Sequence, residues 1–239
     1  MTRSSSVATR RTLYVETFEE GAGGWLAWGF DGAEVPEVQD GVFVTRSPWW
    51  VDPNHAPPGA GYLHLLAYLD MRPDLRPDLC QSNRFVEEGY SRDLTDARVT
   101  VRLRGDLEPR GAQLVLLAQI DLPATRANFV LTGQPFQVTR DWSEQTVVLT
   151  PDPTQWVCLG SRHNRADFYG CGEIAEALRD VNVNIIFVLF PLTIVPLSPV
   201  EELHLSRPHH DYEVDRRYLP EGDVQFDTVR IEYADNKGE

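Results

Sequence analysis

Histidine and aspartate residues occur close together in two polar segments of the sequence. One segment contains His209 and Asp211, and the other contains His163 and Asp167. A histidine near a carboxylate is a pairing used in general acid–base catalysis and in metal binding. The spacing matches no metal motif such as HExxH, and surface loops collect these residue types in any case. These four residues are therefore catalytic candidates only if folding brings the two segments together.

Aromatic residues that could stack on a sugar ring occur in two places. Trp49 and Trp50 are adjacent in a proline-rich segment, and Trp28 lies upstream of them. Sugar rings present C–H faces to aromatic rings, while their hydroxyl groups need polar partners, for which Asn83 and Arg84 are candidates. The alternative for each tryptophan is burial in the core. For the adjacent pair we expect one buried ring and one exposed ring.

Several other kinds of chemistry lack their sequence motifs. The chain contains no GxSxG, no GxxxxGK[ST] and no GxGxxG, so nucleotide-dependent chemistry is disfavoured and no organic cofactor is expected. The three cysteines, Cys80, Cys158 and Cys171, are irregularly spaced and odd in number. This pattern predicts free thiols rather than a disulfide framework or a zinc site.

The charge of the chain limits its partners. Thirty-six acidic residues against 22 Lys and Arg give a formal net charge of −14, which repels nucleic acid phosphates and anionic membrane surfaces. Residues 1–11 lack the apolar stretch of a secretory signal, and the longest apolar run, residues 185–195, is too short to span a bilayer. We therefore expect a cytoplasmic protein that binds neither nucleic acid nor membrane.

Alternating apolar and polar residues predict β-strands along most of the chain. The clearest case is 97–104, where Val99, Val101 and Leu103 fall on one face and the arginines on the other. A short helix is expected at 174–179, and long loops at 47–61 and 191–220. The expected strands are 12–18, 25–30, 41–46, 62–69, 97–104, 113–120, 128–131, 134–138, 144–149, 181–190 and 224–233.

These elements predict the fold class. Many short strands separated by Gly and Pro turns, with almost no helix, are typical of a sandwich or barrel. We predict an all-β fold, a two-sheet antiparallel jelly-roll β-sandwich with long loops and one or two short helices. Residues 12–239 form a single domain after a disordered tail at residues 1–11.

Short motifs spread from residue 12 to residue 233 occur in a familiar order. They are Phe18-Glu19-Glu20-Gly21 followed by Trp25; Trp156, Leu159-Gly160 and Tyr169-Gly170 followed by the apolar strand 183–190; and Phe226-Asp227-Thr228-Val229. This order resembles the galactose-binding-like jelly rolls, a family that includes many carbohydrate-binding modules. The extra length of segments 47–61 and 191–220 departs from a typical module.

The resemblance implies a metal site. In that family a Glu near the N-terminus and an Asp in the last strand hold a structural calcium ion, and Glu19 and Asp227 match these positions. Calcium prefers several oxygen ligands, and backbone carbonyls of residues 21–24 could supply more of them. The alternative is that both carboxylates lie on the surface and bind no ion.

Three functions follow from these observations. The leading hypothesis is a non-catalytic protein that binds a carbohydrate or sugar-like ligand. The second is a carbohydrate-active enzyme, a hydrolase or lyase, that uses the His and Asp residues of the two polar segments. The third is a structural protein that assembles with copies of itself, since sheet edges pair readily.

Overall fold

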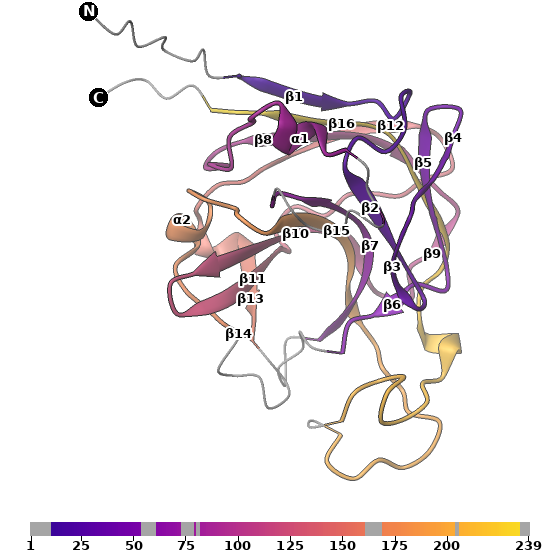
Figure 1. Cartoon of the computed structure of the whole chain (residues 1–239). Coiled ribbons are helices and arrows are strands. Elements are labelled where there is room, and N and C mark those ends of the chain that lie inside the picture. Colours follow the sequence, from indigo (N-terminus) through magenta and orange to yellow (C-terminus); the bar gives the residue numbers. More distant parts are fainter. Residues whose placement is uncertain are drawn as a thin grey trace, which may run out of the picture.

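The computed structural model describes residues 11–53, 61–72, 79, 82–160, 169–203 and 206–234. The described residues form sixteen β-strands, two short α-helices and two 3-10 turns. The strands form two sheets, of seven and nine strands (Figure 1). The predicted all-β fold, a two-sheet antiparallel sandwich with short helices, is confirmed.

The seven-stranded sheet is organised around the last strand. β16 pairs with four other strands, and all of these pairs are antiparallel. In β8 the alternation predicted from the sequence is confirmed, because Val99, Val101 and Leu103 are fully buried. The strands of this sheet are β1 (Leu13–Glu16), β4 (Glu37–Gln39), β5 (Val42–Arg46), β8 (Arg98–Arg104), β9 (Leu107–Glu108), β12 (Ser143–Val148) and β16 (Glu221–Glu232).

The nine-stranded sheet is strongly curved, and Figure 1 shows it as an arch with the seven-stranded sheet along its convex side. Its pairs are antiparallel except for the parallel pair of β14 with β11. Its strands are β2 (Trp25–Gly29), β3 (Gly32–Glu34), β6 (Trp50–Val51), β7 (Tyr62–Asp70), β10 (Gln113–Leu122), β11 (Thr125–Leu131), β13 (Trp156–Leu159), β14 (Tyr169–Gly170) and β15 (Asn184–Leu192). The helical elements are α1 (Arg84–Glu87), α2 (Ile174–Ala177) and the 3-10 turns Pro153–Gln155 and Arg216–Tyr218.

Aromatic side chains join the two sheets at the centre of the sandwich. The ring of Phe187 in β15 lies 4.7 Å from that of Phe226 in β16, measured between centroids, and 5.6 Å from that of Trp25 in β2. Phe43 of β5 packs on Phe226 from the side. All four side chains are essentially inaccessible to water, so they contribute most to the packing between the sheets.

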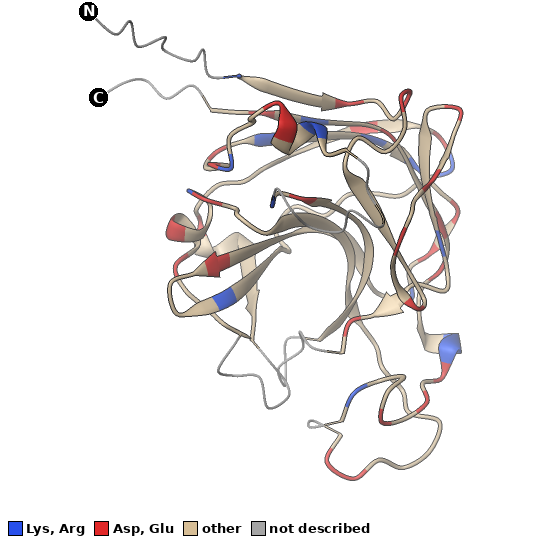
Figure 2. Ribbon diagram, in the orientation of Figure 1, with Lys and Arg blue, Asp and Glu red and all other residues tan. Residues whose placement is uncertain are grey.

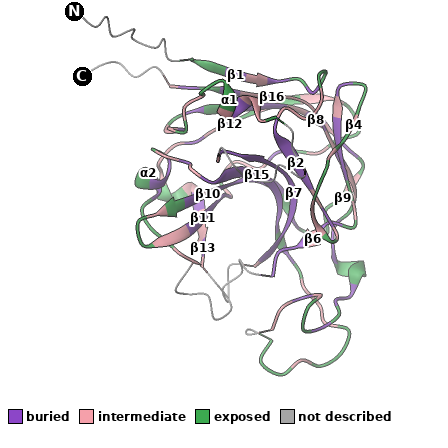
Figure 3. Ribbon diagram, viewed as in Figure 1, coloured by how far each residue is buried: buried purple, intermediate pink, exposed green. Residues whose placement is uncertain are grey.

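A second apolar cluster covers the concave face of the nine-stranded sheet, the face turned away from the seven-stranded sheet. Its members are Leu26, Leu63, Leu65, Tyr68, Val115, Leu117, Val130, Leu159, Ile186, Val188 and Phe190. Because the other face carries the core of the sandwich, β7 is buried along its whole length, and Figure 3 shows the arch as mostly buried. Figure 2 shows the arch as almost free of charged residues.

Several short elements were not expected from the sequence, namely α1, β3, β4, β6, β9, β13 and β14. Segment 47–61 was expected to be a loop throughout, but Trp50 and Val51 pair with Leu65 and His64 of β7. This pairing is possible because the two residues are strong β-formers between prolines. The expected strand 134–138 forms only one bridge, between Phe136 and Leu114. Residues 54–60 and the predicted tail 1–11, apart from its last residue, lie outside the described residues.

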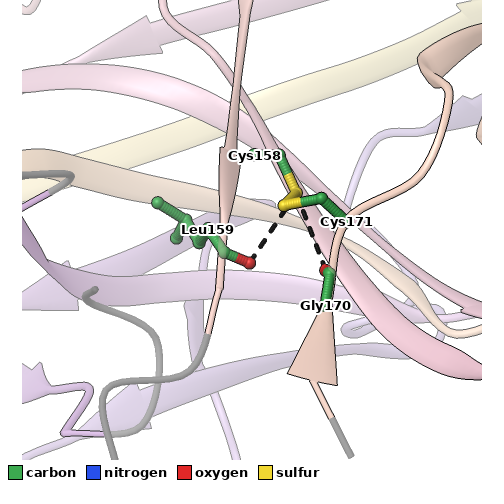
Figure 4. Close-up of a disulfide and its surroundings, with 4 residues drawn as sticks. All are labelled: Cys158, Leu159, Gly170 and Cys171. Carbon is green, nitrogen blue, oxygen red and sulfur yellow. Dashed lines mark hydrogen bonds between the residues drawn. A yellow bond between two sulfur atoms is a disulfide. The ribbon is translucent and has the colours of Figure 1, made fainter. Parts of the chain in front are cut away.

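The prediction of free thiols is wrong for two cysteines, because Cys158 and Cys171 form a disulfide (Figure 4). Cys158 lies in β13, and Cys171 directly follows β14; both strands pair with β11. The pairing with one common strand brings the two cysteines together, and no local sequence motif reports it. The disulfide fastens the edge of the nine-stranded sheet, and Cys80 lies outside the described residues.

Loss of this disulfide should lower stability without abolishing the fold. The two cysteines are 13 residues apart, and a cross-link that closes a loop of this size contributes about 3 kcal/mol in the chain-entropy model. We expect the Cys158→Ser/Cys171→Ser variant to be less stable by up to that amount in urea denaturation. The control is the wild type with and without a reductant. A variant with the same free energy of unfolding as the oxidised wild type would contradict a stabilising Cys158–Cys171 disulfide.

Candidate functional site

A row of polar side chains crosses the concave face at one end of the arch. Gln119 of β10 lies opposite Asn128 of β11 on one side and Asn184 of β15 on the other, and Asn184 lies opposite Asp70 of β7. In each of these strands a residue two positions away belongs to the apolar cluster of the concave face, namely Leu117, Val130, Ile186 and Tyr68, so all four side chains share that face. We call these four residues the amide row.

The amide row is hydrogen-bonded from one strand to the next. Asn184 Nδ2 donates to Gln119 Oε1 at 3.3 Å, and Gln119 Nε2 donates to Asn128 Oδ1 at 2.7 Å. One donor and one acceptor are left over, because Asn128 Nδ2 and Asn184 Oδ1 are buried without a partner among the described residues. An unpaired buried polar group costs about 1–3 kcal/mol. This arrangement therefore favours a ligand that both donates and accepts hydrogen bonds.

The carboxylates at the amide row are held by arginines. Asp70 accepts from Arg72 at 3.0 Å, and Asp121, two residues beyond Gln119, accepts from Arg126 at 2.6 and 2.7 Å. Hydrolysis of a glycoside needs one carboxylic acid that stays protonated, typically in an apolar setting. Here both carboxylates are instead paired with an arginine.

Two of the three predicted platform tryptophans lie together on the concave face. The ring of Trp28 lies 6.3 Å from that of Trp50 and 5.7 Å from that of Tyr68. Trp28 and Trp50 are half-buried, and Trp28 Nε1 has no partner among the described residues. Trp49 points to the opposite face and is buried. In the Trp49–Trp50 pair one ring was expected to be buried and one exposed; Trp49 is buried, while Trp50 is half-buried.

Asn83 and Arg84, the predicted polar partners, make contacts within the fold. Asn83 caps α1 by accepting from Val86 N, and its Nδ2 donates to the backbone carbonyl of Asp70 at 2.6 Å. Arg84 Nη2 donates to Glu16 Oε1 at 3.1 Å. Among the described residues, neither side chain contacts the aromatic cluster of Trp28, Trp50 and Tyr68.

Glu16 is fully buried at the end of β1, and Arg84 neutralises it. Burial raises the pKa of Glu16, while the backbone N–H groups of Phe18 and Thr17 and the Arg84 guanidinium oppose the rise. A Cβ at Gly23 would lie 1.6 Å from Glu16 Oε2. Only glycine therefore fits at position 23, and the turn after β1 is built around this carboxylate.

The predicted calcium residues do not lie in a group of ligands. Asp227 is paired with Arg102 at 2.8 Å, and Glu19 is exposed beside Gly41. Within the described ranges, no group of three or more His, Cys, Asp or Glu side chains is placed to hold a metal ion. The calcium site stays a prediction.

Of the four predicted catalytic residues, His163 and Asp167 lie outside the described residues. His209 lines a cavity of about 330 Å³ together with His64 of β7. Asp211 is not among the residues that line this cavity. Arg207 donates a hydrogen bond to Asp211 at 3.2 Å, and His210 contacts Asp211 at 2.6 Å. The Arg207 and His210 hydrogen bonds hold the pKa of Asp211 well below its usual range.

Both histidines that line the cavity have a lowered pKa, which favours the neutral imidazole ring. Burial lowers the pKa of His64 from 6.5 to about 4, and the hydrogen bond of its Nδ1 to the Trp50 carbonyl only partly opposes this. Burial also lowers the pKa of His209, with Glu213 opposing and Arg216 reinforcing the shift. A carbonyl can only accept, so Nδ1 of His64 carries the proton and Nε2 has a free lone pair.

The amide row and His64 are the functional candidates that sequence reasoning missed. Each is a polar residue inside a strand that is otherwise apolar, as in 62–69 and 181–190. A polar residue within an apolar strand can be recognised from the sequence alone. The alternation in these strands is hidden because both faces are apolar, so the face of each polar residue could not be assigned.

No protein-family profile and no curated protein sequence matches this chain. One similar solved structure comes from work on endo-acting O-glycanases that prominent members of the human gut microbiota express to initiate mucin breakdown. It is 15% identical with a TM-score of 0.42, and the match covers 94% of this chain and 100% of that chain. This similarity is too low to assign an activity. No helix among the described residues is long and apolar enough to cross a bilayer.

Removal of Arg84 should destabilise the protein strongly, because it leaves Glu16 buried without a counter-charge. We expect Arg84→Met to cost about 3–5 kcal/mol in urea denaturation. Arg92→Met is the matched control, since Arg92 pairs with Asp180 at the exposed surface and such pairs contribute about 0–1 kcal/mol. If both variants lost the same small amount of free energy of unfolding, burial of the Glu16 carboxylate would not depend on its ion pair with Arg84.

Acid should destabilise the fold partly through His64. The folded protein keeps this side chain neutral down to pH about 4, while the unfolded chain takes up a proton below about pH 6.5. Stability is therefore lost as the pH falls from 6.5 towards 4. We expect the wild type to lose about 3 kcal/mol more than His64→Gln between pH 7 and pH 4.

The measurement for His64 is urea denaturation at the two pH values. His210→Gln changes an exposed histidine and serves as the control. The same loss in the wild type and in His64→Gln would rule out a buried neutral His64.

Proposed function

We propose that this protein binds a glycan on the concave face of its nine-stranded sheet without cleaving it. The observation that carries the proposal is the amide row, with Asn128 Nδ2 and Asn184 Oδ1 buried and unpartnered among the described residues. A sugar hydroxyl donates and accepts hydrogen bonds at once, so neighbouring hydroxyls of a glycan match a free donor and a free acceptor.

The aromatic cluster supports the same proposal. Trp28, Trp50 and Tyr68 lie on the face that holds the amide row, and a tryptophan ring offers the flat apolar surface on which sugar C–H groups pack. Tyr68 precedes Asp70 by two positions on the same face of β7. A glycan that spans both groups would use stacking at one end and hydrogen bonds at the other.

The finer predictions extend this proposal. We keep the galactose-binding-like relationship, a structural calcium ion, homo-oligomerisation and the cytoplasmic location as predictions. The oxidation state of Cys158 and Cys171 in cells bears on the location, because disulfides persist mainly in oxidising compartments. Thiol labelling of the protein taken from cells measures it directly.

The proposal predicts that binding and stability respond in different ways to one substitution. We expect Asn184→Leu to weaken glycan binding by about 1 kcal/mol or more while the free energy of unfolding falls little or rises, because a buried amide held for a ligand contributes little to the fold. Trp50→Ala should weaken binding by about 1–3 kcal/mol. The measurements are a glycan array to find the ligand, then titration calorimetry and urea denaturation.

Trp142→Ala is the matched control for Trp50→Ala. Trp142 is also half-buried, but it stacks against Arg102 and Arg104 of the seven-stranded sheet. Its loss should leave glycan affinity unchanged. The proposal fails if no glycan binds, if Trp142→Ala weakens binding as much as Trp50→Ala, or if the bound glycan is cleaved.

A further inference from the structure

The cavity that His64 and His209 share lies away from the amide row. Its volume of about 330 Å³ is at the lower end of the range for small-molecule sites, roughly 300–1,000 Å³. Four parts of the chain line it, namely the turn after β2 with Phe30, the link from β5 to β6 with Trp49, strand β7 with His64, and segment 206–221. Residues this far apart in sequence form a cavity only in the folded chain.

Two buried polar atoms of the cavity wall have no partner among the described residues. One is the free Nε2 of His64, and the other is the indole Nε1 of Trp49. Both side chains are about 1% exposed, and their rings lie 5.8 Å apart between centroids. His64 Nε2 can only accept a hydrogen bond in the neutral ring, while Trp49 Nε1 can only donate one. A hydroxyl group placed between them would satisfy both atoms.

The side chain of Arg216 also lines this cavity. The guanidinium of Arg216 lies 4.6 Å above the Phe30 ring, and His209 packs against that ring at 5.3 Å. No carboxylate within the described part of the chain pairs with Arg216, whereas the neighbouring Arg217 is committed to Asp215 at 2.9 Å. Phe30 holds the guanidinium in place, so Arg216 is available to an anionic group.

We propose that this cavity is a second binding site, which takes a small hydroxylated carboxylate of the size of a sugar acid. One hydroxyl of the ligand donates to His64 Nε2 and accepts from Trp49 Nε1. The carboxylate lies on Arg216, and the apolar body of the ligand packs on Phe30 and Trp49. Glu221 also lines the cavity, and its charge favours a ligand with a single carboxylate.

Two other occupants are less suited to these groups. A single water could bridge His64 and Trp49, but it would leave most of the volume of the cavity unused. A metal ion would need more ligands than two histidines, and no group of three suitable side chains occurs among the described residues. A hydroxy acid is the occupant that satisfies the acceptor, the donor and the cation together.

The indole N–H of Trp49 offers a direct readout of binding. In ¹⁵N-labelled protein its resonance is assigned by its absence from Trp49→Phe. We expect titration with D-glucuronate to move this resonance to saturation. D-glucose lacks the carboxylate and cyclohexanecarboxylate lacks the hydroxyls, so each should bind roughly tenfold more weakly or worse. A resonance that stays still with D-glucuronate, or moves equally with D-glucose, would overturn the proposal in favour of a bound water only.

Variants test whether D-glucuronate binds at this cavity and not at the proposed glycan site on the concave face. Arg216→Met should weaken D-glucuronate binding roughly tenfold or more, while Arg140→Met, which changes an exposed arginine far along the chain, should leave it unchanged. Asn184→Leu should also leave it unchanged, because Asn184 belongs to the amide row. Binding that survives Arg216→Met, or that is lost with Asn184→Leu, would refute a separate site at this cavity.

Discussion

Apolar side chains cover both faces of the nine-stranded sheet, one set facing the seven-stranded sheet and the other forming the concave face. An antiparallel sandwich more often leaves its outer face to water. Since most side chains on both faces of β7, β10 and β15 are buried, a buried polar side chain in these strands must find its partners inside the protein or in a ligand. The proposed glycan site and the proposed site for a hydroxylated carboxylate both depend on this constraint.

β7 links the two sites. Tyr68 and Asp70 project to the concave face, while His64 projects to the opposite face towards Trp49. A register shift in the pairing of β7 with β15, between Ala67 and Leu65, lies between these two parts of the strand. A strand that carries polar groups on both faces, within an apolar sheet, contributes less to stability than an all-apolar strand would. In exchange it supplies polar groups to both of the proposed binding sites.

The sequence predicted the sheets better than the sites. Alternation in 97–104 revealed β8, because one face of that strand meets solvent. The same rule fails for His64 and Asn184, whose strands are apolar on both sides, so a polar residue there could not be given a face. Trp28 and the adjacent Trp49 and Trp50 were singled out from residue type alone, and a short strand, β6, places Trp50 beside Trp28. The disulfide was missed because it depends on two strands meeting on β11, which is a non-local event.

The first and last strands are neighbours in the seven-stranded sheet, with Leu13 opposite Glu232 (Figure 1). Both therefore leave the sandwich at one place, in the layer that lies opposite the concave face. A tether, a solid support or a fused domain attached at either position would stand clear of the amide row. The same adjacency makes the architecture suitable for circular permutation, since a short peptide could join the two strand ends. The fold thus separates the two strand ends from the proposed binding face.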